Sequence, residues 1–296
     1  MGESRKEDSP IMKVKNKKIP ALALLIAIAL VLVLLIFLLD EPQPEAEVTE
    51  PTEPVATTEA TEPTDPYAFA HTPQDKLVVF ARLNNLSIEE DWPEDILELL
   101  WNNPDAEEFA LNYPLLKGTS QDADLSDLVG TGKVPKLYQW DERWGYSKYG
   151  DKAMGLTGCG PTCLSMVACY LTGDAAHSPD NMIRFALDNG YCSPGNGSSW
   201  TLFSQGAGKL GLTATELPLV KKTIFSHLEA GRQVICVMGP GVFTTAGHFI
   251  VMTGLKDGLI CVNDPNSRAN SQKLWDFDQI SDQIRNLWML EKAPVG

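Results

Sequence analysis

One cysteine in this sequence occupies a position typical of a reactive thiol. Cys159 lies between two glycines, and Pro161 follows it in a position that is favoured in a first helical turn. At a helix N-terminus the unpaired backbone N–H groups and the helix dipole both favour a thiolate. The flanking Gly158 and Gly160 would let a substrate backbone approach closely. We therefore predict that Cys159 is a nucleophile; the alternative for this segment alone is a structural cysteine in a glycine turn.

A nucleophilic thiol needs a base, and one of the four histidines is well placed to be that base. His248 opens the apolar run 249–252, which has the composition of a buried strand. A polar ring at the mouth of such a strand can face a pocket. Of the other three histidines, His71 lies at the end of an acidic stretch, His177 in a Ser/Pro-flanked loop and His227 on a predicted helix. A structural, hydrogen-bonded histidine is the alternative for His248.

A carboxylate follows on the next predicted strand. Asp257-Gly258 is a strong hairpin turn signal, so the runs 248–255 and 259–262 are expected to pair antiparallel. Asp264 then returns beside His248 and can orient its imidazole. An Asp-Pro turn is the alternative for Asp264 alone. The three residues together predict a cysteine peptidase or amide hydrolase that acts through a thioester.

The elements around these residues alternate between helices and short strands from residue 133 onward. Apolar spacing and Gly stop signals predict helices over 159–171, 179–189, 200–210 and 221–230. Runs rich in Val and Ile predict strands over 233–238, 248–255 and 259–262. We expect an α+β domain over 133–296 in which the helix that carries the nucleophile packs on an antiparallel sheet.

A smaller helical segment is expected ahead of this domain, over residues 67–117. Helical spacing begins near Pro73, and Pro93-Glu94-Asp95 resembles a first turn with favourable acids. A further short helix starts at Asn103 and is expected to end at Tyr113-Pro114. We interpret this segment as a scaffold that packs on the next domain, and residues 118–132 as a loop.

The N-terminal part predicts a membrane anchor. Residues 1–18 carry six bases against three acids, and 21–39 are uniformly apolar without an A-x-A cleavage pattern. We expect a cytoplasmic tail (1–18), a transmembrane signal anchor (19–39) and an extracellular catalytic domain. Residues 40–66 hold nine acids and no base, with repeated Pro, which predicts a disordered stalk.

Charge and cysteine content exclude some partners and leave one question open. The net charge is −15 and no basic patch is evident, which argues against a nucleic-acid partner. Cys159 and Cys163 could share a helix face, but no CxxC or HExxH motif occurs, so we predict no metal and no cofactor. The six cysteines of an exported domain could form disulfides, although a working thiol leaves five, which cannot all pair.

From about Val134 to Trp288 the sequence resembles the peptidase family thirty-nine-like domain (the double-glycine leader peptidase type), a branch of the papain-like cysteine peptidases. The resemblance covers just over half of the chain, and the helical lead-in also resembles one that often precedes this domain. It rests on the segments 138–144, 158–162, 197–200, 247–251 and 263–266.

This resemblance implies a papain-like fold with Cys159 as nucleophile, His248 as base and Asp264 as its orienting group. It also implies that Gln139 contributes to the oxyanion hole, although Gln139 lies 20 residues before Cys159, farther than in the transporter-fused members. Peptides, proteins or peptidoglycan fragments are the expected substrates. The predicted groove residues are Trp140, Gly158, Gly160, Trp200 and Gly247. The alternative function is a catalytically silent groove that binds cell-wall material or a partner protein.

Overall fold

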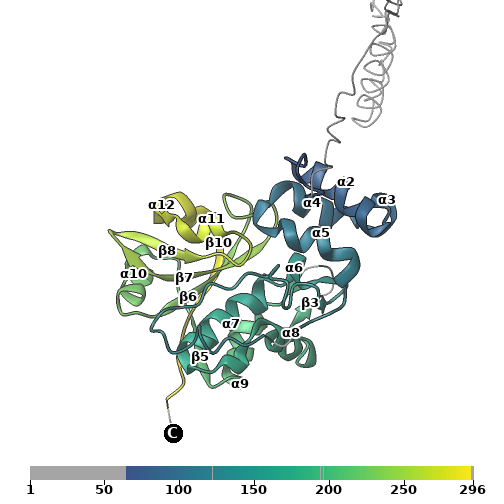
Figure 1. Cartoon of the computed structure of the whole chain (residues 1–296). Coiled ribbons are helices and arrows are strands. Elements are labelled where there is room, and N and C mark those ends of the chain that lie inside the picture. The colour runs from purple at the N-terminus through teal and green to yellow at the C-terminus, as the bar shows by residue number, and fades with distance from the viewer. Residues whose placement is uncertain (1–64, 122, 194, 196, 295–296) are drawn as a thin grey trace, which may run out of the picture. The chain divides into compact units, whose positions relative to one another are not determined.

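The computed structural model describes residues 65–121, 123–193, 195 and 197–294 (Figure 1). The predicted tail, the predicted anchor and residues 40–64 of the predicted stalk lie outside the described residues. Within those described ranges, no helix has the length and apolar content needed to cross a membrane.

A six-stranded sheet forms the centre of the α+β fold. Its strands lie in the order β5-β10-β6-β7-β8-β9, and every neighbouring pair is antiparallel. The strands are β5 (Leu212–Glu216), β6 (Gln233–Met238), β7 (His248–Lys256), β8 (Leu259–Asn263), β9 (Leu274–Trp275) and β10 (Ile284–Lys292). The predicted α+β class with an antiparallel sheet is therefore confirmed.

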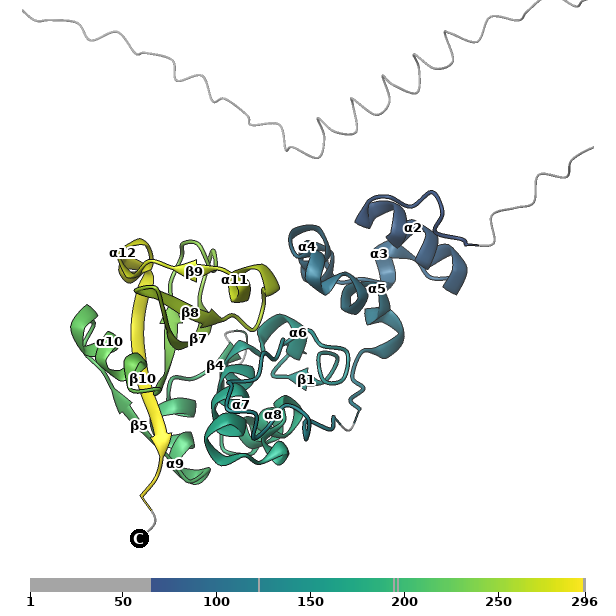
Figure 2. The same ribbon diagram turned by 60° about the vertical axis from the view of Figure 1, so that its left-hand side comes forward.

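Helices cover both faces of this sheet because its central strands are apolar on both faces. All six residues of β6 are buried. Ile235 and Val237 belong to the core around α7 (Cys159–Thr172). The residues that alternate with them, Val234, Cys236 and Met238, belong to the core around α10 (Lys221–Glu229). Figure 2 shows α7 and α10 on opposite sides of the sheet. The helix that begins at Cys159 thus rests on one face of the sheet, as predicted.

The hairpin that carries His248 and Asp264 is confirmed. β7 pairs with β8, and Val251 lies opposite Asn263. The two turn residues both have positive φ, 54° at Asp257 and 75° at Gly258, as a type I′ turn in a two-residue hairpin loop requires. The register shifts by one residue at an irregularity between Met252 and Gly254. The turn and this shift together therefore set the pairing at the far ends of the two strands.

Three strands of the central sheet were not expected from the sequence: β5, β9 and β10. β10 pairs with both β5 and β6. Both partners of β10 are distant in sequence, so no local turn signal marks it. The helix predicted over 200–210 is also irregular: it has π-helical geometry over Leu202–Gly206 and α-helical geometry only over Ala207–Lys209 (α9).

The predicted helical segment contains α2 (Pro73–Asn84), α3 (Ile88–Asp91), α4 (Glu94–Asn102), η1 (Pro104–Ala106) and α5 (Glu107–Leu116). These helices do not form a separate hydrophobic core of their own. Buried Ile96 and Phe109 share one hydrophobic cluster with Trp140 and Tyr146 of the following segment. The lead-in helices and the C-terminal part therefore pack as one body.

The expected end of the last lead-in helix at Tyr113-Pro114 is wrong, because α5 continues to Leu116. A proline inside a helix leaves the carbonyl four residues earlier without its N–H partner. Here that carbonyl belongs to Ala110, and the indole N–H of Trp92 donates to it at 2.8 Å. The side chain of the residue that follows α3 thus replaces the missing backbone donor.

The remaining elements are short, apart from the ten-residue helix α8. The two-stranded sheets are β1–β2 (Lys148–Tyr149 and Lys152–Ala153) and β3–β4 (Cys192–Ser193 and Gly197–Ser198). The helices are α6 (Met154–Thr157), η2 (Ala175–His177), α8 (Pro179–Asp188), α11 (Arg268–Gln272), α12 (Phe277–Ile280) and η4 (Ser281–Gln283).

Candidate active site

Cys159 is the first residue of α7, as the sequence predicted. Gly158 precedes it as the N-cap residue, and the Thr162 hydroxyl donates to the Gly158 carbonyl at 2.8 Å. The thiol is partly exposed, whereas Cys163 one turn later is fully buried. Cys159 therefore stands at the end of the helix where backbone N–H groups lack intrahelical partners.

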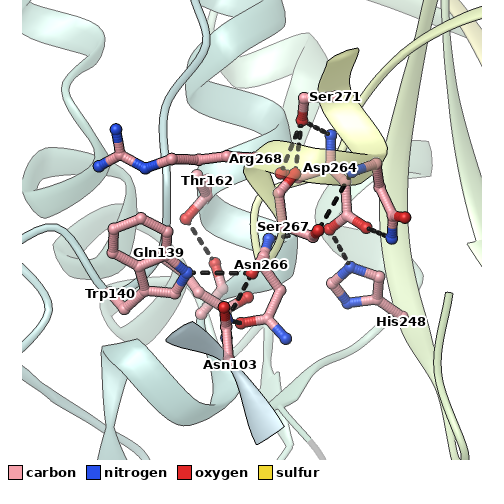
Figure 3. A network of polar contacts seen from close by, with 12 residues as sticks. Asn103, Gln139, Trp140, Thr162, His248, Asp264, Asn266, Ser267, Arg268 and Ser271 are labelled. Atoms are coloured by element: carbon pink, nitrogen blue, oxygen red, sulfur yellow. Dashed lines mark hydrogen bonds and ion pairs between the residues drawn. The ribbon is translucent and has the colours of Figure 1, made fainter. Parts of the chain in front are cut away.

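His248 and Asp264 meet at the end of the hairpin. His248 Nε2 lies 2.8 Å from Asp264 Oδ1 (Figure 3). The two side chains are 7% and 1% exposed, so water does not compete for this contact. With Nε2 bound to the carboxylate, Nδ1 is the ring nitrogen left to serve the thiol.

Asp264 is held by hydrogen bonds to its own loop and to α11. Its Oδ1 accepts from the backbone N–H of Asn266 at 2.8 Å, and its Oδ2 accepts from Asn270 Nδ2 at 2.8 Å. Its own backbone N–H donates to Ser271 Oγ at 2.9 Å. These contacts fix the orientation of the carboxylate toward the imidazole.

The environment favours the charged form of both partners. Burial alone would raise the pKa of Asp264, but the imidazolium of His248 and the hydrogen bonds from Asn270 and Asn266 outweigh it and lower that pKa. Burial alone would lower the pKa of His248, but the Asp264 carboxylate, with a further contribution from Cys159, raises it. An imidazolium beside an ionised carboxylate is therefore the favoured state.

A cleft of about 400 Å³ brings the predicted residues together. Its walls include Cys159, His248, Gln139, Trp200 and Gly247. Trp200 is 46% exposed and packs edge-on against Trp288. The remaining lining residues are Leu156, Thr157, Gly195, Gly197, Ser198, Val237, Thr244, Ala246, Phe249 and Asn266.

Gln139 reaches this cleft although it is 20 residues from Cys159 in sequence. Its backbone N–H donates to the Pro265 carbonyl at 2.8 Å, and its side-chain Nε2 donates to the Gly155 carbonyl at 2.8 Å. One of the two amide protons is thus used for positioning, and the second is available to another acceptor. The side chain is 4% exposed, and its Oε1 has no partner among the described residues.

Three of the predicted groove residues do not line this cleft. Trp140 is buried, and its indole N–H donates to the Asn266 carbonyl at 3.1 Å. At Gly158 an added Cβ would overlap the Met154 side chain, and at Gly160 it would overlap Ser198. These two glycines therefore permit close packing around the start of α7, rather than the approach of a substrate.

Several residues of the site were not singled out from the sequence. Asn270 and Ser271 hold Asp264 from α11, and Asn103 of the lead-in contacts Asn266. Asn266 itself belongs to the segment 263–266 on which the family resemblance rests. The others carry no local signal, because Asn and Ser are common in turns and short helices.

Metal and disulfide chemistry find no support among the residues described. No group of three or more His, Cys, Asp or Glu side chains in the described ranges could hold a metal ion. All six cysteines lie in those ranges, and each carries a free thiol.

Comparisons with known proteins found a matching family and similar solved structures. A model of the Peptidase_C39 like family matches residues 131–290. The peptidase domain of Streptococcus ComA, a bi-functional ABC transporter involved in a quorum sensing pathway, is 18% identical; the match covers 47% of this chain and 93% of that domain, with a TM-score of 0.36. A protein from Bacillus anthracis described as a C39-like peptidase is 16% identical; that match covers 56% and 98% of the two chains, with a TM-score of 0.34. No curated protein matches the chain.

Proposed function

Because the chain belongs to the Peptidase_C39 like family, a papain-like peptidase family, we propose that it is a cysteine peptidase whose catalytic residues are Cys159, His248 and Asp264. The observation that carries this proposal is the buried His248–Asp264 pair, 2.8 Å apart, whose imidazole lines the same cleft as a thiol at a helix N-terminus. A base, its orienting group and a nucleophile in one cleft are the parts that covalent acyl transfer requires.

In the proposed reaction the Cys159 thiolate attacks the carbonyl carbon of a peptide or amide bond. The C–S bond forms first, and the displaced electron pair places negative charge on the carbonyl oxygen. The carbonyl then re-forms as the C–N bond breaks, and the His248 imidazolium gives its proton to the departing amine. Water then attacks the thioester while His248 removes one of its protons, and the C–S bond breaks to restore the thiolate. Asp264 keeps the ring oriented and stabilises its positive charge in both steps.

Gln139 is the proposed side-chain donor of the oxyanion hole. Its remaining amide proton would stabilise the negative oxygen that develops on the carbonyl, together with the backbone N–H at the start of α7. A neutral amide is suited to this role because it does not titrate. The hydrogen bond from its Nε2 to Gly155 supports the role, because it fixes the amide before a substrate arrives.

The proposed substrates are peptides, proteins or peptidoglycan-derived fragments outside the cytoplasm. The support for this location is the basic tail (1–18), followed by an apolar anchor (19–39) and an acidic stalk (40–66). A single-pass protein of this kind would present its cleft to material near the membrane surface.

Selective alkylation of Cys159 by iodoacetamide tests the proposal. We expect the Cys159 thiolate to react well below pH 8 in the parent protein, and this reactivity to be lost in His248→Ala, because the imidazolium stabilises the thiolate. Cys192 is an internal control: it is also partly exposed, but burial raises its pKa. Peptide-level mass spectrometry separates the two sites. A single midpoint near about 8.5, the value of an ordinary cysteine, in both proteins would contradict the proposal.

A binding module is the second candidate function, and the half-exposed Trp200 in the cleft favours it. Aromatic side chains at the surface often form recognition platforms. Tight binding of cell-wall fragments by Cys159→Ala, with no turnover of a peptide library or wall digest by the parent protein, would favour this function over catalysis.

A further inference from the structure

The loop that carries Asp264 is bound by residues far away in the sequence. Asn103, at the junction of α4 and η1, donates from Nδ2 to the Asn266 carbonyl at 2.7 Å. Trp140 donates from its indole nitrogen to the same carbonyl at 3.1 Å. Figure 3 shows the two side chains beside Asn266, on the far side of the loop from His248. Two donors from separate segments thus converge on a single oxygen.

Asn266 connects these donors to the proposed catalytic pair. Its backbone N–H donates to Asp264 Oδ1 at 2.8 Å, and the same oxygen contacts His248 Nε2 at 2.8 Å. A continuous series of hydrogen bonds therefore runs from Asn103 through Asn266 and Asp264 to His248.

A second contact from the lead-in ties down the end of this loop. Asp105 Oδ2 accepts from the backbone N–H of Arg268, the first residue of α11, at 2.8 Å. The Arg268 guanidinium also lies over the rings of Tyr138 and Trp140, 4.9 Å from each centroid. The loop is thus held from the lead-in at two points, Asn266 and Arg268.

We propose that Asn103 is a positioning residue for catalysis: together with Trp140 it holds the Asn266 carbonyl, so that Asp264 stays aligned with His248. This inference rests on the proposed function of the pair. It assigns to the lead-in helices a part in the active site, in addition to the packing that they provide. Small displacements of an orienting group matter, since a shift of about 1 Å can lower a rate by about a hundredfold.

The charged state of His248 reports on this alignment. The ionisable groups that act on His248 are Asp264 at the end of β8 and Cys159 at the start of α7. Asp264 in turn acts on Cys163 of α7 and on Tyr138. A change at Asn103 removes none of these groups, so any effect on His248 must pass through their positions.

The test replaces Asn103 by serine in the full-length chain. Asn103 Oδ1 also accepts from the backbone N–H of Asp105 at 3.1 Å, and a serine hydroxyl can retain this capping contact. The shorter side chain loses the donor to Asn266. Asn112→Ser is the matched control, because Asn112 Nδ2 donates to Glu142 at 3.0 Å between the same two parts of the molecule, without a contact to the site.

The readout is the pH dependence of iodoacetamide alkylation at Cys159, measured peptide by peptide. The parent should show two steps, one for formation of the thiolate–imidazolium pair and a higher one for loss of the imidazolium proton. In Asn103→Ser the higher step should move to lower pH by about half a unit, about a threefold change in the equilibrium, because a displaced carboxylate stabilises the imidazolium less. A variant that also carries Trp140→Phe, and so lacks both donors, should move further.

Asn112→Ser should keep the parent profile. An unchanged higher step in Asn103→Ser, or an equal shift in Asn112→Ser, would overturn the inference about Asn103 while the two-step profile still supported the catalytic pair. A single step that is the same in the parent and in His248→Ala would instead overturn the proposed function, and the inference with it.

Discussion

At the scale of single residues, His248 and Asp264 form a buried charge pair. The contribution of Asp264 to folding stability is lost at low pH, and that of His248 is lost at high pH. Asp264 has a lowered pKa, so its stabilising contribution is present above the unfolded value of about 3.9 and is lost as pH falls through the folded value. His248 has a raised pKa, so its contribution is present below about 6.5 and is lost as pH rises through the folded value.

The pair should therefore stabilise the fold most between about pH 4 and about pH 6.5. The double variant His248→Gln/Asp264→Asn removes both charges while the side chains remain polar and similar in size. We expect the difference in unfolding free energy between parent and double variant to be largest inside this window and smaller on both sides. Urea unfolding across the pH range measures it; a difference that does not vary with pH would show that the pair is not charged in the fold.

At the scale of elements, the start of α7 is built for close packing. Gly160 faces Ser198 of β4 so closely that a methyl group would overlap the serine hydroxyl. Ser198 also accepts or donates a hydrogen bond at 2.7 Å with buried Tyr149, so it cannot move freely. The β3–β4 wall of the cleft and α7 are therefore fixed relative to each other.

We expect Gly160→Ala to destabilise the protein by about 1–3 kcal/mol, the usual cost of an added methylene in a packed core. It should also slow alkylation of Cys159, because the cleft wall must shift. Gly208→Ala in α9 is the control, since a Cβ there meets no atom within 4 Å and alanine is favoured in helices. Thermal unfolding compares the two variants; equal melting temperatures would contradict the packing argument.

At the scale of the whole molecule, the lead-in helices and the C-terminal part share a core. Ile96, Leu100 and Phe109 pack in one cluster with Trp140 and Tyr146. An ion pair between Lys152 and Asp95, 2.8 Å apart, joins the same two parts. Removal of the lead-in would expose Trp140 and Tyr146, which are 4% and 1% exposed in the fold.

A series of N-terminal truncations tests the organisation of the chain. The full chain should sediment with membranes, and a chain that begins at residue 40 should not, because the proposed anchor has been removed. Chains that begin at residues 40 and 65 should unfold in one cooperative urea transition. A chain that begins at residue 118 should lose this transition or show it at much lower urea, because a shared cluster is cut open. Equal urea midpoints for the chains that begin at residues 65 and 118 would show that the lead-in is dispensable for folding.

The sequence alone was sufficient for those features that depend on local chemistry. Cys159 before Pro161 marked a helix N-terminus, and Asp257-Gly258 marked the turn that brings His248 and Asp264 together. These signals are short in range, because capping and turn geometry depend on a few neighbouring residues. The α+β class followed from the same local patterns.

Tertiary structure decided what depends on partners distant in the chain. β10 pairs with β5 and β6, and no neighbouring turn marks it. α5 continues past Pro114 because Trp92, 18 residues before Ala110, supplies the missing donor. Asn103 and Asn266 are separated by 163 residues, yet they form one of the contacts that hold the Asp264 loop. A hydrogen bond between residues far apart in the sequence forms only when the packed core brings them together. No short pattern in the sequence can therefore predict it.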